Sequence, residues 1–153
     1  MPGTPAFVDT NVLLYAGRPN AAEHARSRAA LSRLHGDGAP LWLSRQIFRE
    51  YLAAATRPQA SGPALPMAAS ISDVHGFHAV FNVAEDGPNV LDRLLHLLAA
   101  HPGGGKQVHD ANVEPRGSPD IVATMLEHRI ARLLTFNAAD FRRFGSLIEV
   151  ITP

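Results

Sequence analysis

Short apolar segments that pass directly into a polar helix start recur along this chain, and they constrain its fold more than any other feature. Phe7-Val8 is followed at once by Asp9-Thr10-Asn11, and Leu41-Trp42-Leu43 is followed by Ser44. The side chains of Asp, Thr, Asn and Ser cap helix N-termini. Each apolar segment is therefore expected to be a short strand that leads into a helix.

Strands that alternate with helices and are apolar on both faces predict a parallel sheet with helices on both sides. We expect one three-layer α/β/α domain over residues 1–153, with a central, mainly parallel sheet of about five short strands. The expected strands cover residues 7–8, 41–43, 80–83, 132–136 and 148–151. The first expected helix begins at Asn11. The others cover residues 21–34, 45–56, 66–76, 89–100, 121–128 and 138–144.

The helix expected at 89–100 carries the most continuous apolar stripe of the chain. Its members are Val90, Leu91, Leu94, Leu95 and Leu98. An apolar stripe on a helix is buried against another element. We therefore expect these residues to lie in the core or in a subunit interface.

The composition excludes several other classes of protein and site. The chain contains no cysteine, which excludes disulfides, thiolate metal sites and cysteine nucleophiles. It has no apolar run of about twenty residues and no signal-peptide pattern at its N-terminus, so we expect a cytoplasmic protein without a membrane partner. The formal net charge is zero, so nucleic acid would have to be bound by a local positive patch.

Carboxylates fall where predicted strands end or helices begin: Asp9, Glu50, Asp110 and Asp140. The alternative for Asp9 is a simple helix cap, and for Glu50 a surface glutamate whose stem covers the edge of the core. In a parallel sheet, however, all four acids map to the same edge, which is where ligands bind. Carboxylates gathered in one cleft raise each other's pKa, and a hard cation resolves this conflict. Oxygen ligands without cysteine favour Mg²⁺ or Mn²⁺.

The chain resembles PIN-domain ribonucleases, and specifically the VapC toxins of bacterial type II toxin–antitoxin systems. Five phrases carry the resemblance in the family's order: Val8-Asp9-Thr10-Asn11-Val12-Leu13, Phe48-Arg49-Glu50-Tyr51, Val108-His109-Asp110-Ala111-Asn112, Ile121-Val122-Ala123-Thr124-Met125-Leu126 and Leu134-Thr135-Phe136-Asn137-Ala138-Ala139-Asp140-Phe141. The resemblance implies an Mg²⁺- or Mn²⁺-dependent endoribonuclease. It also implies a homodimer that is held inactive by an antitoxin encoded beside it.

By this resemblance Asp9 and Asp110 bind the metal, and Glu50 and Asp140 complete the acidic pocket. A metal-activated water then attacks the RNA phosphodiester, so no protein nucleophile is needed. Short polar side chains are candidates to orient the carboxylates or the water, with helix capping or a chain turn as the alternative role: Thr10, Asn11 and Asn137.

Basic side chains near the same edge are candidates to contact RNA phosphates, with simple surface solvation as the alternative. They are Arg45, Arg49, Lys106, Arg142 and Arg143.

The segment 113–120 departs from the family pattern, in which a helix runs directly from Asn112 into Ile121. Two prolines and a glycine in eight residues cannot continue a helix. We therefore expect Asp110 on a loop or a single turn. Asp120 stands beside Ile121 rather than three residues before it, so we expect it to point away from the pocket.

This departure leaves a second hypothesis open, which is a catalytically impaired PIN fold that binds RNA or an antitoxin. A third is phosphoryl transfer through a phospho-aspartate at Asp9. Against the third stands Asn11, which occupies the position where haloacid-dehalogenase-like enzymes have a second Asp.

Overall fold

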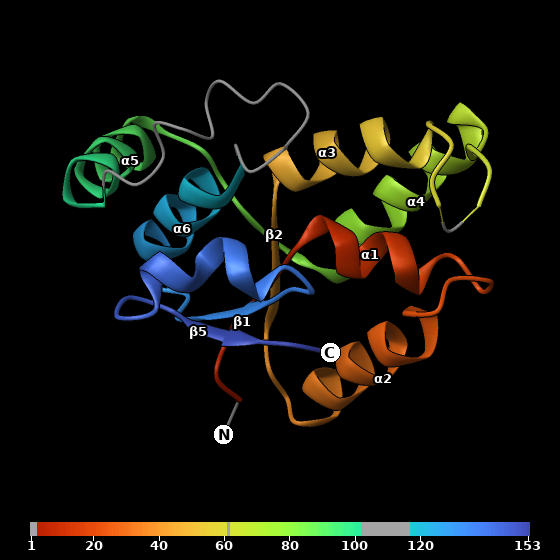
Figure 1. Cartoon of the computed structure of the whole chain (residues 1–153), viewed down its shortest axis with the longest axis horizontal. Coiled ribbons are helices and arrows are strands. Elements are labelled where there is room, and N and C mark those ends of the chain that lie inside the picture. Colours follow the sequence, from red (N-terminus) through yellow and green to blue (C-terminus); the bar gives the residue numbers. More distant parts are fainter. Residues whose placement is uncertain (1–2, 61, 102–116) are drawn as a thin grey trace.

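Five short strands form one parallel sheet in the order β3-β2-β1-β4-β5. A computed structural model describes residues 3–60, 62–101 and 117–153 (Figure 1). The strands are β1 Ala6–Val8, β2 Leu41–Ser44, β3 Asn82–Ala84, β4 Arg132–Leu134 and β5 Glu149–Ile151. The predicted α/β class and parallel sheet are therefore confirmed.

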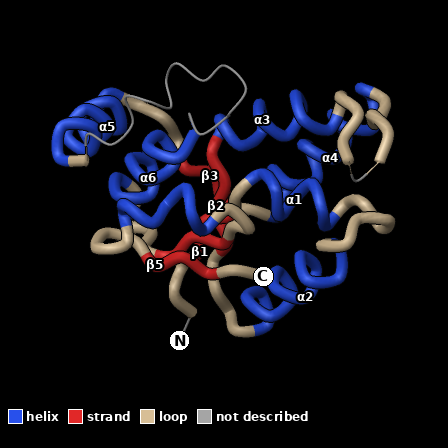
Figure 2. Tube along the Cα trace, in the orientation of Figure 1, coloured by secondary structure: helices blue, strands red, loops and turns tan. Residues whose placement is uncertain are grey.

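Six α-helices and a 3-10 helix connect the strands within the described residues (Figure 2). They are α1 Thr10–Ala16, α2 His24–Gly36, α3 Arg45–Ala55, α4 Met67–Val80, α5 Pro88–Ala100, α6 Gly117–Glu127 and the 3-10 helix η1 Ala138–Phe144. Helix α1 packs on α2 and α3, α3 packs on α4, and α5 packs on α6. None of the helices in these ranges is both long and apolar enough to cross a lipid bilayer.

Strand β1 lies at the centre of the sheet and of the core. Ala6, Phe7 and Val8 are completely buried. The strand pairs with β2 on one side, where Ala6 faces Leu41, and with β4 on the other, where Ala6 faces Arg132. Because all strands are parallel, their carboxyl ends share one edge, and Asp9 stands at the middle of that edge.

Helix α4 is longer than its sequence pattern predicts. The expected end at Gly76 is wrong, since the helix continues to Val80 and β3 begins at Asn82. A glycine inside a helix costs only about 1 kcal/mol relative to alanine. The packing of the Phe77 ring edge-on against the Tyr51 ring, with centroids 4.9 Å apart, is available only if the helix continues past Gly76.

The leucine stripe of α5 is mostly outside the core. Leu91, Leu95 and Leu98 are 55%, 56% and 43% exposed, whereas Val90 and Leu97 are buried. Of the two places expected for the stripe, the core holds only part of it, and a subunit interface stays a prediction for the exposed leucines. Helix α5 packs on α6 through a face turned by about one residue from the predicted stripe.

Truncation of the central strand should be costly. Replacing Phe7 by alanine leaves a cavity in the core, and we expect the free energy of unfolding to fall by about 3–5 kcal/mol. The matched control is Leu91→Ala, which removes an exposed side chain and should change the free energy by less than about 0.5 kcal/mol. Urea denaturation of both variants checks this, and a small loss in Phe7→Ala would contradict the placement of β1.

Candidate active site

Asp9 ends β1 and caps α1 with a buried carboxylate. Its Oδ1 accepts a hydrogen bond of 2.7 Å from the Thr10 backbone N–H. Its Oδ2 accepts one of 2.8 Å from the Thr135 hydroxyl and a longer one of 3.4 Å from the Asn11 amide. Asp9 is therefore both the helix cap and an inward-facing acid at the carboxyl edge of the sheet.

Thr10 connects Asp9 to Glu50. The Thr10 hydroxyl donates a hydrogen bond of 2.8 Å to Glu50 Oε2, while its backbone N–H binds Asp9. The other oxygen of Glu50, Oε1, accepts a bond of 2.8 Å from the Gln46 amide one helical turn earlier. Strand β1 ends and helix α3 begins at this edge of the sheet. A single threonine therefore joins two acids that are 41 positions apart in the sequence.

Asn11 and Thr135 fix the far side of Asp9. The Asn11 side chain donates to the Thr135 hydroxyl at 3.3 Å and accepts from the Phe136 N–H at 3.2 Å. Thr135 also accepts a bond of 3.0 Å from the Asn137 N–H. Thr135, which directly follows β4, therefore holds both Asp9 and the chain that leads into η1.

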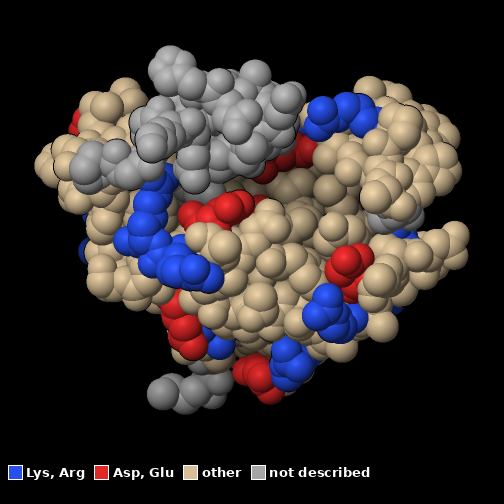
Figure 3. All heavy atoms as spheres, viewed as in Figure 1, with Lys and Arg blue, Asp and Glu red and all other residues tan. Residues whose placement is uncertain are grey.

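Burial raises the pKa of Asp9 above its usual value of 3.8. The hydrogen bonds from Thr135 and Thr10 lower this pKa again, and the charges of Glu50 and Asp140 raise it further. Asp140, an exposed residue of η1, is therefore within electrostatic reach of Asp9. Figure 3 shows carboxylate atoms gathered in a hollow between α3 and η1, with basic side chains at its border.

Asp120 is within electrostatic reach of Glu50. It is in the first turn of α6, and its pKa is raised by burial first and then by the charges of Asp86 and Glu50. The expectation that Asp120 points away from the pocket stays a prediction. The described part of segment 113–120 begins α6 at Gly117, so its last residues are helical.

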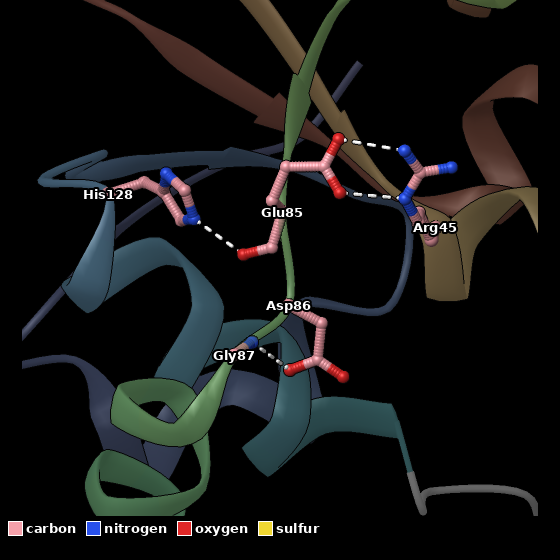
Figure 4. A network of polar contacts seen from close by, with 5 residues as sticks. All are labelled: Arg45, Glu85, Asp86, Gly87 and His128. Carbon is pink, nitrogen blue, oxygen red and sulfur yellow. Dashed lines mark hydrogen bonds and ion pairs between the residues drawn. The ribbon is translucent and has the colours of Figure 1, made fainter.

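Several predicted residues lie outside the described residues or have other partners. Asp110 and Lys106 fall in the range 102–116, which lies outside the described residues. Arg45 binds both carboxylate oxygens of Glu85, at 2.7 and 2.8 Å, and the Glu85 carbonyl accepts a bond from the His128 ring (Figure 4). Arg49 and Arg142 are exposed near the hollow, and their contact to RNA stays a prediction.

Sequence analysis missed Thr135 and Gln46. Thr135 lies within a phrase that resembles the family, and its position directly after an apolar strand is the same signal that identified Asp9. Gln46 lies four residues before Glu50, a spacing at which helical side chains meet. Each could have been found by asking which polar groups satisfy a buried carboxylate.

The donor chemistry of this edge fits a hard cation. Its acids offer only oxygen ligands, and burial of Asp9 raises the cost of its negative charge, as its raised pKa indicates. Among the described residues, no three Asp, Glu or His side chains lie close enough together to hold a metal ion.

Comparisons with known proteins identify the family of this fold. The PIN domain family matches residues 6–147. A comparison with curated proteins finds no match. Among solved structures, VapBC-1 from nontypeable Haemophilus influenzae has a TM-score of 0.67 at 16% identity over 97% of this chain and 98% of that one.

Two further solved structures are similar. VapC20 from Mycobacterium tuberculosis, described as a sarcin-ricin loop cleaving toxin, has a TM-score of 0.64 at 16% identity over 95% of this chain and 98% of that one. A toxin–antitoxin complex from Klebsiella pneumoniae has a TM-score of 0.61 at 20% identity over 97% of both chains. At such identities the likeness shows the fold.

The buried charge of Asp9 predicts a pH-dependent stability. Because folding raises its pKa above 3.8, the contribution of Asp9 to stability is full below pH 3.8 and is lost as the pH rises through the folded-state pKa. Asn caps helices as well as Asp does, so Asp9→Asn keeps the cap without the charge. We expect the stability of Asp9→Asn relative to the unsubstituted protein to increase from pH 4 to pH 7.

Chemical denaturation at several pH values measures this difference. The matched control is Asp37→Asn, which changes an exposed acid in the turn after α2. If the stability of Asp9→Asn relative to the unsubstituted protein stays constant or falls as the pH rises, ionisation of Asp9 does not destabilise the folded state.

Proposed function

Because the chain belongs to the PIN domain family, we propose that it is a metal-dependent endoribonuclease and the toxin of a toxin–antitoxin pair. The family matches residues 6–147, which is nearly the whole chain. The proposal is supported by one observation above all, namely that Thr10 joins the buried Asp9 to Glu50 at the edge where parallel sheets bind ligands.

Asp9, Glu50 and Asp140 would hold a divalent cation together with Asp110. Carboxylate oxygens are the ligands of Mg²⁺ and Mn²⁺, and either cation suits this set. When bound, such a cation lowers the pKa of its water ligand and neutralises charge on a phosphate. The raised pKa of Asp9 supports the assignment, since a bound cation would offset the cost of burying its charge and the smaller repulsion from Glu50 and Asp140.

The chain's own residues orient the acids. Thr135 and the Thr10 N–H fix the two oxygens of Asp9, so its carboxylate cannot turn freely. Thr10 and Gln46 do the same for Glu50. Loss of a side chain that hydrogen-bonds to a metal ligand typically lowers metal affinity or activity by about 10–100-fold. Asn11 and Asn137 support Thr135 in the same way, Asn137 through its backbone N–H.

RNA is the proposed substrate, and exposed arginine side chains would contact its phosphates. Arg49 and Arg142 are exposed there, whereas Arg45 is held by Glu85. Lys106 completes the proposed set. VapC20, a structural neighbour, is described as a toxin that cleaves the sarcin-ricin loop, which supports an RNA substrate for this chain as well.

We propose a protein antitoxin as the regulatory partner and a second copy of the chain as the structural one. The structural neighbour from Klebsiella pneumoniae was solved as a toxin–antitoxin complex, which supports the first. Both partners and the RNA substrate are consistent with a cytoplasmic site of action.

Cleavage of RNA tests the proposed chemistry. We expect the purified protein to cut a fluorescent RNA with Mn²⁺ present, and Asp9→Asn to reduce the rate by at least ~100-fold, as for the loss of a preorganised electrostatic group. Asp37→Asn should cleave at the normal rate. RNA binding without cleavage by the unsubstituted protein would favour the catalytically impaired PIN fold, and unchanged cleavage by Asp9→Asn would disprove the proposed role of Asp9.

Asp110 and Asp120 compete for the fourth position in the acidic pocket. We expect Asp110→Asn to lose as much activity as Asp9→Asn, because it removes a proposed metal ligand. Asp120→Asn should retain at least ~10% of the rate, because it removes only a neighbouring charge from Glu50. Both are measured in the same RNA cleavage assay. If Asp120→Asn lost more activity than Asp110→Asn, Asp120 in the first turn of α6 would be the fourth acid of the pocket.

A further inference from the structure

An aromatic residue, Phe136, stands directly beside the network that holds Asp9. It follows Thr135, whose hydroxyl donates a hydrogen bond to Asp9. The Phe136 N–H donates a bond of 3.2 Å to Asn11 Oδ1, and the Asn11 amide donates one of 3.4 Å to Asp9 Oδ2. The backbone of Phe136 is thus separated from the buried carboxylate by a single side chain.

Two side chains pack on the ring of Phe136. The Tyr15 ring meets it edge-on, with centroids 5.3 Å apart and an angle of 89° between the ring planes. The Arg26 guanidinium lies over the ring, with its Cζ 5.2 Å from the centroid. Phe136 is half-buried and packs against the core, whereas Arg26 is exposed. We call Tyr15, Phe136 and Arg26 the aromatic shelf.

The Arg26 pair differs from the second cation–π pair of the described residues. There, Arg143 lies over the ring of its sequence neighbour Phe144, which is 1% exposed. Arg26 instead reaches a ring from a distant part of the chain, at a position beside the acidic site. Within the described ranges Arg26 forms no ion pair with a carboxylate. Its charge is therefore available to a ligand.

Helix α2 surrounds Arg26 with positive charge. Within His24–Gly36 it carries three arginines and no acid, while Glu23 and Asp37 stand directly outside these bounds. All three arginines are exposed: Arg26, Arg28 and Arg33. Because the chain has no formal net charge, nucleic acid must be bound by a local excess of cations, and α2 provides one. Helix α2 packs on α1, which begins at the acidic edge (Figure 1).

We propose that the aromatic shelf binds one unpaired base of the RNA substrate, which stacks on the guanidinium of Arg26. The proposal deepens the ribonuclease function proposed above and rests on it. Unpaired RNA bases stack on aromatic rings and on arginine guanidinium planes. A guanidinium that lies on a ring keeps its other flat face for a base and its N–H groups for a phosphate. The shelf would hold a nucleotide beside the proposed cleavage site.

The chemistry of the aromatic shelf favours RNA over a protein partner. An RNA strand carries flat bases and phosphates together, so one nucleotide supplies both a stacking surface and an acceptor for Arg26. An apolar protein surface would bury the cations of α2 without partners, which is costly. The exposed arginines beside the shelf would instead neutralise neighbouring phosphates of the same strand.

Removal of single bases from the RNA tests the proposal. Fluorescence anisotropy measures the dissociation constant of a short single-stranded RNA, and of the same RNA with each base removed in turn. Asp9→Asn, which we expect to be nearly inactive, serves as the background in which the RNA stays intact. We expect one position at which removal of the base raises the dissociation constant at least ~10-fold, as for the loss of a stacked base.

Arg26→Lys separates stacking from charge, because lysine keeps the charge but has no flat face. The dissociation constant of the intact RNA should rise at least ~10-fold, and removal of the same base should then have little further effect. The dependence of binding on salt should be unchanged, because the number of cations is unchanged. The matched control is Arg33→Lys, which alters another exposed arginine of α2 and should preserve the effect of the base.

A second variant, Phe136→Leu, removes the ring under the guanidinium and keeps an apolar side chain. The effect of the same base should again be lost. The matched control is Phe81→Leu, which changes another half-buried phenylalanine that packs against the core. Phe81 directly precedes β3 and therefore lies at the opposite edge of the sheet, so its replacement should preserve the effect of the base. Thermal unfolding of both variants checks that each is folded.

Other outcomes overturn the proposal. An unsubstituted protein that neither binds nor cleaves RNA would disprove the ribonuclease function and the aromatic shelf together. If the unsubstituted protein cleaves RNA but no position is sensitive to base removal, the shelf alone is disproved. The same holds if Arg26→Lys and Phe136→Leu retain the full effect of the base.

Discussion

The burial of the Asp9 carboxylate is the constraint on which the rest of the site depends. A carboxylate at the end of a central strand can be tolerated only if its oxygens find donors, and Thr10 and Thr135 provide them. These bonds bring together the ends of β1 and β4, and Thr10 extends the network to Glu50 on α3. The acidic hollow is thus a consequence of how the sheet satisfies one buried charge.

The fold was predictable from the sequence because its strands are short and apolar, and because two of them are followed directly by a capping residue. Asp9 and Ser44 mark two of these junctions, and the side chains of both cap the following helices in the structure. Asp9, Thr10 and Glu50 were also identified in advance, and the hydrogen bonds among them make the two alternatives for Asp9 compatible. A residue can cap a helix and face a pocket at the same time.

What the sequence could not predict depends on contacts between distant segments. Thr135 acts through a bond to a residue 126 positions away, and no local pattern encodes that distance. The buried side of α5 is selected by its packing on α6, which is why the predicted stripe is displaced to the surface. Helix α6 begins at Gly117, three residues before Asp120, although the sequence predicts its start at Ile121. Each of these features depends on tertiary contacts that local sequence patterns do not encode.

The pairing of β1 with β4 has a consequence for when the pocket can exist. Ala6 lies beside Arg132, and Thr135 comes from the final segment of the chain. Contacts between residues so far apart in sequence form late, after most of the chain is available to fold. A chain still emerging from the ribosome therefore has Asp9 and Glu50 but not the strand that orients them. The pocket is therefore complete only after β4 and Thr135 have been synthesised and have joined β1.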